Sequence, residues 1–242
     1  MNHKIKALII FNHIAAIIAL AYGNLGFLCG TVIAFVFINK LGGEIGLHRY
    51  FCHRSFTTTK FWHFTMLVAA SLNCFGPPMA WVGVHRKHHI DSDTTNDPHG
   101  KQAAWRVWLT VWKPFHIDMK YIKDMLRDKE QMFVYKYYFW LIGIVWLSLF
   151  FINWQLPIFL ISLPSVISFH LAGLVNTVCH MSGYRLYETK DTSYNNKWVN
   201  MITLGSGLHN THHAFPSSWD NRRNSKDIDM TAVIIKTILI KN

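Results

Sequence analysis

Two long stretches of the sequence contain no Asp, Glu, Lys or Arg, although the chain has 24 Lys and Arg and 13 Asp and Glu residues. They cover residues 7–39 and 137–184. A helix needs about 20 apolar residues to cross the hydrocarbon core of a bilayer, which is about 30 Å thick. Each stretch is therefore long enough for a hairpin of two membrane-spanning helices. Short, uncharged turns are expected at 22–26 and 153–157, where the sequence reads YGNLG and NWQLP.

The distribution of the charged residues predicts the orientation of these hairpins. Only 15% of the chain is charged and 51% is hydrophobic, whereas a soluble domain carries about 25% charged residues. Every charged residue falls on the side of the membrane that holds both termini. Basic residues accumulate on the cytoplasmic side, so both termini are expected in the cytoplasm. The formal net charge of +11 then indicates attraction to a membrane surface and to lipid head groups rather than to nucleic acid.

Two further stretches leave room for other interpretations. The apolar run after Lys4 and Lys6 could be a cleaved signal peptide. Polar residues interrupt that run and a second span follows at once, so we expect the first helix to be retained. A third uncharged stretch, residues 61–84, is also long enough to span. Because it is interrupted at 71–73 and by Gly-Pro-Pro at 76–78, it is predicted to be an interfacial or re-entrant helical segment.

Histidines form three clusters outside the charge-free stretches, in the sequences HRYFCH, HRKHH and HNTHH. In the last two, the spacing i, i+3, i+4 would gather three imidazoles on one face of a helix. The first pair is five residues apart and does not align on a straight α-helix, so one member is expected where the helix ends or bends. A further histidine ends the fourth span, with Asn176 one turn before it. The nine candidate ligands are His48, His53, His85, His88, His89, His180, His209, His212 and His213.

The nine histidines indicate a site for a pair of metal ions. Imidazole is a neutral ligand for iron, zinc and copper. Nine nitrogens are too many for one ion and suit two. A pair of irons can hold and split O2, whereas zinc pairs more often include carboxylates or keep a water for hydrolysis. An all-nitrogen pair of ions beside membrane-buried hydrocarbon favours oxidative attack on an unactivated C–H bond, with no separate nucleophile or general base.

The same residues resemble a known family. The three clusters are similar to the three histidine boxes of membrane-bound fatty acid desaturases of the acyl-CoA and acyl-lipid Δ9 type. The resemblance extends beyond the boxes and covers most of residues 40–220. The segments that carry it, in the order found in the family, are GEIGLHRYFCHRSF, WVGVHRKHHIDSDTTNDPHG, LVNTVCHMSGYRLYETKDTS and GLHNTHHAFP.

The resemblance implies an all-α integral membrane protein made of one desaturase domain, residues 1–242. Four transmembrane helices in two hairpins, approximately 7–39 and 137–184, would form a stem. A helical cytoplasmic cap from 40–136 and 185–242 would hold two irons, which form the catalytic centre. The nine histidines would be the ligands, and Asn176 would reach one metal through water. The implied reaction inserts a cis double bond into a saturated acyl chain, using O2 and two electrons from a separate carrier.

The third histidine cluster departs from the family's pattern. The family usually has Gly-Glu-Gly or Gly-Glu-Ser before it, whereas this chain has Ser206 at the position of the Glu. A Glu three residues before a ligand is placed to orient an imidazole, and losing such a partner typically costs about 10–100-fold in metal affinity or activity. We therefore expect weaker metal retention or slower turnover, unless Glu44, Asp93 or Asp97 takes its place.

Basic residues beside the first two clusters are candidates for binding a phosphate-bearing head group of the substrate. They are Arg49, Arg54, Arg86 and Lys87. The alternative is the ordinary basic surface of a membrane protein. Trp81 could line the tunnel for the acyl chain, with packing in the core as the alternative. The acyl carrier is left open between coenzyme A, a carrier protein and a glycerolipid.

The electrons are expected from a separate protein of the ferredoxin or cytochrome type. The sequence contains no haem-binding HPGG segment of the fused-cytochrome kind. Two alternative functions are left open. One is a related di-iron membrane hydroxylase or alkane monooxygenase, which uses similar boxes at different spacing. The other is a catalytically inactive, metal-binding membrane protein. An alkene product would exclude hydroxylation, and an alcohol product would exclude desaturation.

Overall fold

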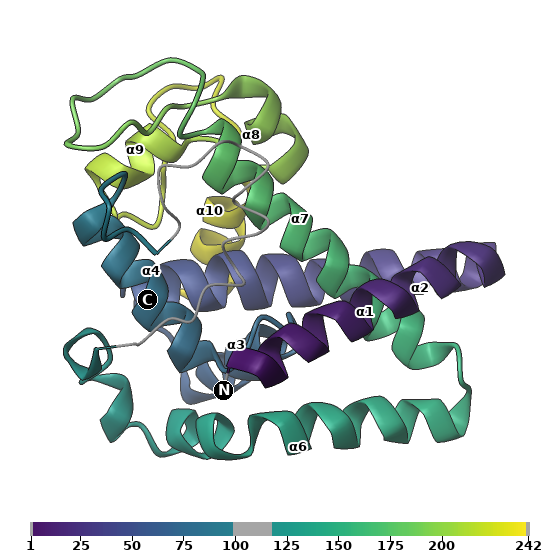
Figure 1. Ribbon diagram of the computed structural model, residues 1–242. Helices are drawn as coiled ribbons and strands as arrows, with labels where there is room; N and C mark the ends of the chain where they lie inside the picture. Colours follow the sequence, from purple (N-terminus) through teal and green to yellow (C-terminus); the bar gives the residue numbers. More distant parts are fainter. Residues whose placement is uncertain (1, 99–117, 241–242) are drawn as a thin grey trace.

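The four predicted membrane-spanning helices are present in the computed structural model, which describes residues 2–98 and 118–240 (Figure 1). Helices long and apolar enough to cross a membrane cover His3–Tyr22, Leu25–Cys52, Lys129–Ile152 and Ile158–Val178. They are built from α1 (Asn2–Tyr22), α2 (Leu25–Phe35) continuing as η1 (Val36–Cys52), α6 (Lys129–Ile152), and η4 (Ile158–Ser162) continuing as α7 (Leu163–Val178). The described residues contain no β-strand. The prediction of an all-α protein with two helical hairpins is therefore confirmed.

Both hairpin turns lie where uncharged polar residues interrupt the apolar runs. Between α1 and α2, the side-chain oxygen of Asn24 accepts a hydrogen bond from the backbone N–H of Phe27 at 3.1 Å. Asn is favoured at this position because it satisfies an N–H that has no partner within the helix. Asn153 follows α6, and its side chain accepts a hydrogen bond from the N–H of Gln155 at 2.9 Å. The residues that predicted the turns also make the hydrogen bonds that form them.

The outward faces of the long helices are apolar. Leu20, Phe151 and Trp140 are 79%, 82% and 75% exposed. Soluble monomers rarely expose contiguous apolar surface of this kind, so these faces are expected to contact lipid.

The second span is longer than the sequence predicted. The first hairpin was expected to end near residue 39, but the helix continues without a break through Lys40 and Glu44 to Cys52. The two charged side chains form an ion pair at 2.7 Å, and Lys40 also donates to the backbone oxygen of Thr203. Because each charge is compensated, the helix can carry both of them inside the protein. This continuation brings His48 onto the same helix that crosses the membrane.

The continuation is wound as a π-helix over 17 residues. In a π-helix the backbone N–H bonds to the carbonyl five residues earlier, and such turns occur frequently at functional sites. At its end, the N–H of His53 donates to the carbonyl of His48 at 3.1 Å. The spacing of five residues between His48 and His53 does not fit an α-helix. It equals the spacing between hydrogen-bonded residues in a π-helix. As expected, the helix ends at this pair, with His53 directly after its last residue.

The third uncharged stretch forms two helices instead of a span. They are α3 (Lys60–Ser71) and α4 (Pro78–Asp91), separated by six residues in which Cys74 and Gly76 have positive φ angles of 60° and 104°. The expected interruption of this stretch is therefore observed. The break returns the chain toward η1, so that the histidines of α4 and those of η1 lie at the same end of the molecule.

Close packing of α3 against η1 depends on a glycine. A Cβ atom placed on Gly42 would lie 2.3 Å from the carbonyl carbon of Ala69 and 2.6 Å from the backbone nitrogen of Ala70. Real Cβ atoms do not approach backbone this closely, so the two helices would have to separate.

Substitution of Gly42 by Ala is expected to destabilise the fold. Overpacking of this kind costs about 1–3 kcal/mol, and here the contact is with rigid backbone. The apparent Tm in detergent should fall by several degrees. Gly143→Ala on α6 is the matched control, because a Cβ at that position meets nothing within 4 Å and Ala favours helix. Equal Tm values for the two variants would show that α3 does not rest on η1 in this way.

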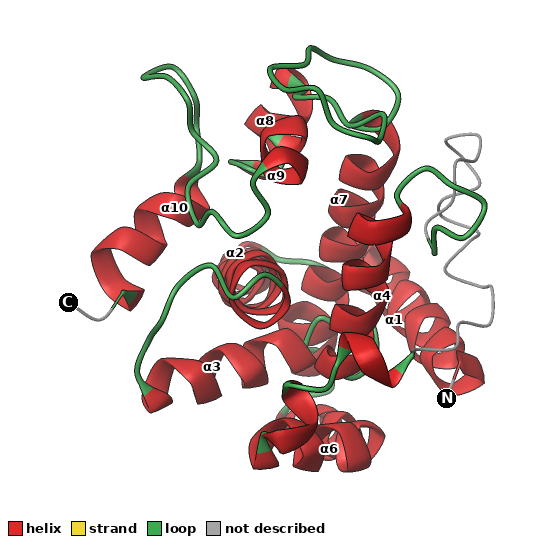
Figure 2. Cartoon of the chain, turned by 90° about the vertical axis from the view of Figure 1, so that its left-hand side faces the viewer, coloured by secondary structure: helices red, strands yellow, loops and turns green. Residues whose placement is uncertain are grey.

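The remaining helices gather at one end of the four long ones. They are η2 (Met119–Tyr121), η3 (Met125–Arg127), α8 (Lys197–Thr203), α9 (His209–Ala214), α10 (Met230–Ile234) and η5 (Ile235–Leu239). Figure 1 shows α4, α8 and α9 together at this end, while α1, α2 and α6 extend toward the other. Figure 2 looks almost along α2, with α3 and α6 on one side and α8, α9 and α10 on the other. Residues 99–117 of the predicted cap lie outside the described residues.

Candidate metal centre

All nine histidines singled out in the sequence come together at the cap end of the long helices. They form two groups, and within each group the ligand nitrogens lie within 4.8 Å of one another. The first group is His48, His53, His85, His89 and His212. The second group is His88, His180, His209 and His213. Five and four nitrogen donors suit two separate ions, as the sequence predicted.

Each of two helices contributes to both groups. On α4, His85 and His89 belong to the first group, whereas His88 belongs to the second. On α9, His212 belongs to the first group, and His209 and His213 belong to the second. The spacing i, i+3, i+4 therefore does not place three imidazoles on one ion, as a self-contained motif would. It spreads them over an arc wide enough to serve two neighbouring ions.

The Nε2 atoms point toward one another with the spacing of metal ligands. His212 Nε2 lies 2.9 Å from His48 Nε2 and 3.1 Å from His89 Nε2. In the second group, His180 Nε2 lies 3.0 Å from His209 Nε2. Two nitrogens bound at right angles to one ion at about 2.1 Å would be about 3.0 Å apart. These distances are therefore compatible with nitrogens that share a bound metal ion.

Buried nitrogens without hydrogen-bond partners support the same interpretation. His53 Nε2 and His213 Nε2 are buried and make no hydrogen bond within the described residues. Buried polar atoms are almost always paired, so such atoms need an explanation. A metal ion that accepts the lone pair of each nitrogen supplies one.

Six of the nine imidazoles are held neutral, which is the form that binds metal. Burial lowers the pKa of His53 to about 3, with a further contribution from neighbouring imidazoles. Burial also lowers the pKa of His213 to about 4, although the carboxylate of Asp191 opposes that shift. Burial lowers the pKa values of His85, His89, His209 and His212 well below the ordinary value. At neutral pH each of these six imidazoles is therefore uncharged and has one ring nitrogen with a free lone pair for a metal.

Three carboxylates bond to the outer nitrogen of histidines in the second group. Asp97 lies 2.9 Å from His88 Nδ1, and Asp93 lies 3.2 Å from His180 Nδ1. Asp191 lies 2.7 Å from His213 Nδ1. Such a bond fixes the tautomer and the ring orientation, and it makes the other nitrogen a better ligand. Burial would raise the pKa values of Asp93 and Asp191, but their histidine partners and neighbouring hydrogen bonds hold both below the usual range.

Sequence reasoning suggested two of these three carboxylates and missed the third. Asp191 lies eleven residues after His180 in a loop, so no helical or strand spacing connects it to a histidine. Its position inside the segment YETKDTS, which resembles the family, was the available signal.

Glu44 does not have the role that the sequence suggested. Its carboxylate bonds to Lys40 at 2.7 Å and to the hydroxyl of Thr231 at 2.8 Å, and it forms no hydrogen bond to a histidine among the described residues. The physical reason is the buried ammonium group one turn earlier, which requires a counter-charge.

Ser206 lies on the wall of a cavity beside the first group of histidines. His212 lines the same cavity, and its Nδ1 atom is buried without a hydrogen-bond partner in the described structure. Ser206 donates its backbone N–H to Thr203 Oγ1 at 3.1 Å, but its hydroxyl makes no bond to an imidazole. The residue that differs from the family's pattern thus lies near a histidine that lacks an orienting partner.

Substitution of Ser206 by Glu is expected to increase metal retention. A carboxylate here could accept a hydrogen bond from His212 Nδ1, and such partners change metal affinity by about 10–100-fold. The measurement is the metal that remains on purified protein after dialysis against a chelator of graded strength. Ser206→Ala, which adds no acceptor, is the control. Unchanged metal retention and unchanged turnover in the Glu variant would contradict the expectation.

The cavity beside the histidines has a volume of about 110 Å³ and lies between the long helices and the cap. Its wall includes Leu47, Phe75, Leu171 and Val175, together with histidines of both groups. Trp81 also lines it and stacks on His85, with ring centroids 4.7 Å apart and an interplanar angle of 15°. Asn176 of α7 lies on the same wall. A short segment of an apolar chain in this cavity would lie against histidines of both groups.

The basic residues proposed to bind a head group are mostly engaged within the protein. Arg49 is 3% exposed and bonds to both carboxylate oxygens of Asp229, at 2.9 and 3.0 Å. Lys87 pairs with Asp91 on the next turn of α4. Arg49 also lines the cavity beside the histidines, so its part in binding a head group stays a prediction. Arg54 and Arg86 both bond to Asp124 and line a separate hollow.

Comparisons with known proteins agree with this geometry. The fatty acid desaturase family model matches residues 19–223. A sn-1 stearoyl-lipid 9-desaturase of Anabaena variabilis is 33% identical over 236 residues, which cover 94% of this chain and 87% of that protein. A sn-1 stearoyl-lipid 9-desaturase of Synechocystis sp. is 34% identical over 210 residues, which cover 84% of this chain and 66% of that protein. The Delta-9 desaturase-like 3 protein of Arabidopsis thaliana is 29% identical over 204 residues, which cover 78% of this chain and 66% of that protein.

The family match covers most of the chain and includes all nine histidines. The described part of the chain has four helices that are long and apolar enough to span a membrane, with an imidazole-rich centre at one end of them. This chain belongs to the fatty acid desaturase family and is an oxidoreductase that acts on lipid acyl chains.

Proposed function

We propose that the chain is an O2-dependent di-iron acyl-lipid desaturase that inserts a cis double bond at position 9 of a saturated acyl chain. The observation that carries this proposal is the pair of all-imidazole groups beside a cavity lined by apolar side chains. A glycerolipid is favoured over coenzyme A and carrier protein, because two relatives similar over most of this chain are stearoyl-lipid 9-desaturases.

Two irons fit the donor set better than other pairs of ions. Nine neutral nitrogens with outer hydrogen bonds to carboxylates provide strong ligands but no directly bound carboxylate in either group. Iron, when bound, would activate O2 and remove two hydrogens from adjacent carbons of the chain. The role of the protein is to hold both ions, to place the acyl chain against histidines of both groups and to exclude water. Asn176, on the cavity wall one turn before His180, is proposed to reach one ion through water.

The chain is proposed to lie in the membrane as one desaturase domain with both termini and the metal centre on the cytoplasmic side. The basis is the accumulation of basic residues outside the two hairpins. Electrons are proposed to come from a separate protein of the ferredoxin or cytochrome type.

Expression in a host that cannot make unsaturated fatty acids tests the proposal. Mass spectrometry of intact lipids should find a cis double bond at carbon 9 of chains esterified to glycerol, and growth without added unsaturated fatty acid should resume. His212→Ala serves as the inactive control. Hydroxylated chains would contradict desaturation, and labelled product found first on coenzyme A would contradict the acyl-lipid assignment. An iron-free protein without product would indicate an inactive relative.

A further inference from the structure

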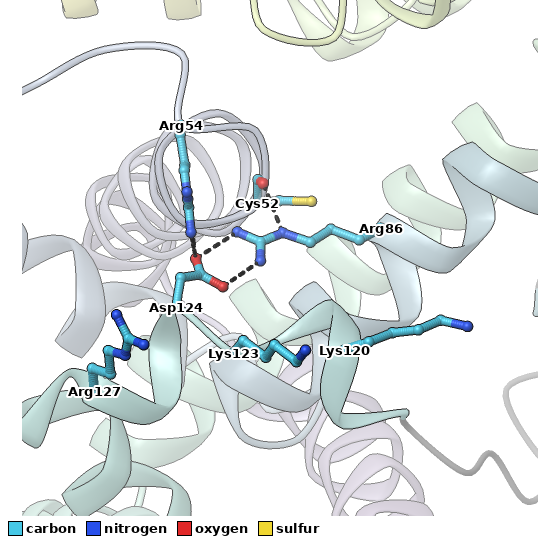
Figure 3. A pocket seen from close by; sticks show the side chains of 7 residues that line it. All are labelled: Cys52, Arg54, Arg86, Lys120, Lys123, Asp124 and Arg127. Atoms are coloured by element: carbon cyan, nitrogen blue, oxygen red, sulfur yellow. Dashed lines mark hydrogen bonds and ion pairs between the residues drawn. The ribbon is translucent and has the colours of Figure 1, made fainter.

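A basic hollow of about 530 Å³ opens on the surface next to the metal centre (Figure 3). Its lining contains five cationic side chains and a single carboxylate, Asp124. The cationic residues are Arg54, Arg86, Lys120, Lys123 and Arg127. Figure 3 shows Arg54 and Arg86 converging on Asp124, with the other three along the short helical stretch that precedes α6.

The positive charge of this hollow is not neutralised within the described structure. Asp124 accepts hydrogen bonds from Arg86 at 2.7 and 3.0 Å and from Arg54 at 3.0 Å. Although burial opposes it, Arg86 and Arg54 lower the pKa of Asp124 to about 2, so it stays ionised at neutral pH. Lys123 and Arg127 are exposed and form no ion pair with another described residue. An excess of exposed positive charge thus surrounds one fixed carboxylate.

The floor of the hollow is joined directly to ligands of the first histidine group. Arg86 follows His85 in α4. Its guanidinium donates to the backbone oxygen of Cys52 at 2.9 Å and to that of Phe51 at 2.7 Å. Cys52 is covalently bonded to His53. The hydrogen bond from Arg86 to Cys52 and the peptide link from Cys52 to His53 therefore connect the hollow with an imidazole of the first histidine group.

The hollow and the acyl-chain cavity are separate. They share no lining residue, and Trp81 and His85 lie on the cavity wall whereas Arg86 and Cys52 lie in the hollow. The hollow is therefore a feature distinct from the cavity that is proposed to hold the acyl chain.

We propose that this basic hollow is the docking surface for an acidic, one-electron carrier protein that reduces the metal centre. The inference rests on the proposed function, because an O2-dependent desaturation takes two electrons from outside the protein. Forming one double bond and reducing O2 to two waters uses the two hydrogens of the chain, two electrons and two protons. The electrons come from the carrier in two encounters, and the protons come from solvent. Electron-transfer encounters use small interfaces, and charge complementarity accelerates their formation.

Charge reversal at the rim provides the test. The variant Lys123→Glu/Arg127→Glu changes two exposed residues that do not touch the histidines, so iron content and fold should be unchanged. The control Lys197→Glu/Lys226→Glu makes the same change in net charge on exposed residues outside the hollow. A reduced, acidic [2Fe–2S] ferredoxin is the electron donor in one assay. Dithionite with methyl viologen, which needs no docking, is the donor in the other.

The rim variant should lose about tenfold or more in ferredoxin-driven kcat/KM and in ferredoxin affinity at low salt, because steering by charge changes association rates by factors of 10 to 1,000. Its dithionite-driven rate should equal that of the wild type. The wild-type ferredoxin-driven rate should fall as salt increases, because exposed charges are screened beyond about 8–10 Å. Equal losses in the rim and control variants, or no loss in either, would overturn the proposal.

Two further readouts separate other outcomes. If the rim variant loses only its association with phosphatidylglycerol vesicles while its ferredoxin-driven rate is unchanged, the hollow is a lipid contact and the proposal is wrong. Absence of alkene in the dithionite assay would overturn the proposed function. In that case, the affinity for ferredoxin still decides whether the hollow docks an acidic carrier.

Discussion

Replacing Asp191 with Asn should remove one of the two proposed metal ions and lower activity by about 10–100-fold. Asp191 accepts the Nδ1–H of His213 at 2.7 Å and so presents the Nε2 lone pair to the second group. Asn can place its amide nitrogen toward the ring, which favours the wrong tautomer. Iron per chain, measured on the purified protein, should fall from two ions toward one, because the first group keeps its five imidazoles.

The control for this experiment is Asp220→Asn. Asp220 pairs with Arg222 at 2.7 Å and contacts no histidine, so its loss should leave iron and activity unchanged. If Asp191→Asn retains both ions and full activity, the carboxylate does not orient His213. If it loses both ions together, the two groups do not load independently.

Replacing Asp229 with Asn should cost about 3–5 kcal/mol of unfolding free energy. The change leaves the guanidinium of Arg49 buried without a counter-charge, because Asp229 lies against it at 2.9 Å and neither side chain is more than 3% exposed. Asn can still accept the N–H of Ala232 that Asp229 caps, so the start of α10 is preserved. The measurement is denaturant unfolding in detergent, followed by the fluorescence of the tryptophans.

A double variant separates the lost ion pair from a local packing defect. Arg49→Met/Asp229→Asn removes both charges and should recover most of the stability, because a buried ion pair can often be replaced by apolar groups at little cost. A double variant no more stable than Asp229→Asn would show that the unpaired charge is not the cause.

The sequence predicted the spans and the gathering of the nine histidines because both depend on local patterns. Absence of charge over 33 or more residues is visible in the chain itself, and so are the polar turns such as the one at Asn24. The histidine spacing indicated helical faces, and the charge pattern indicated that all three clusters share one side. These features require no knowledge of which segments pack together.

What the sequence did not show depends on contacts between distant residues. Arg49 and Asp229 are 180 positions apart, and Asp191 meets its histidine through a loop. Glu44 was assigned to a histidine because nothing nearby in sequence reveals that Lys40 is buried beside it. The division of α4 and α9 between the two histidine groups follows from which imidazoles of the two helices meet, such as His88 with His213 and His89 with His212, and spacing within one helix does not determine this.

Because η1 is a π-helix, the number of residues in it matters for the position of its histidines. Its 17 residues place His48 and His53 at successive hydrogen-bonded positions, and their rings lie 4.9 Å apart. In an α-helix, residues five apart diverge by about 140° around the axis. Deleting one residue from this segment would favour the tighter winding and turn one imidazole away. Homologous chains should therefore show many substitutions in this helix but the same number of residues. Insertions or deletions should be confined to the turn near Asn24.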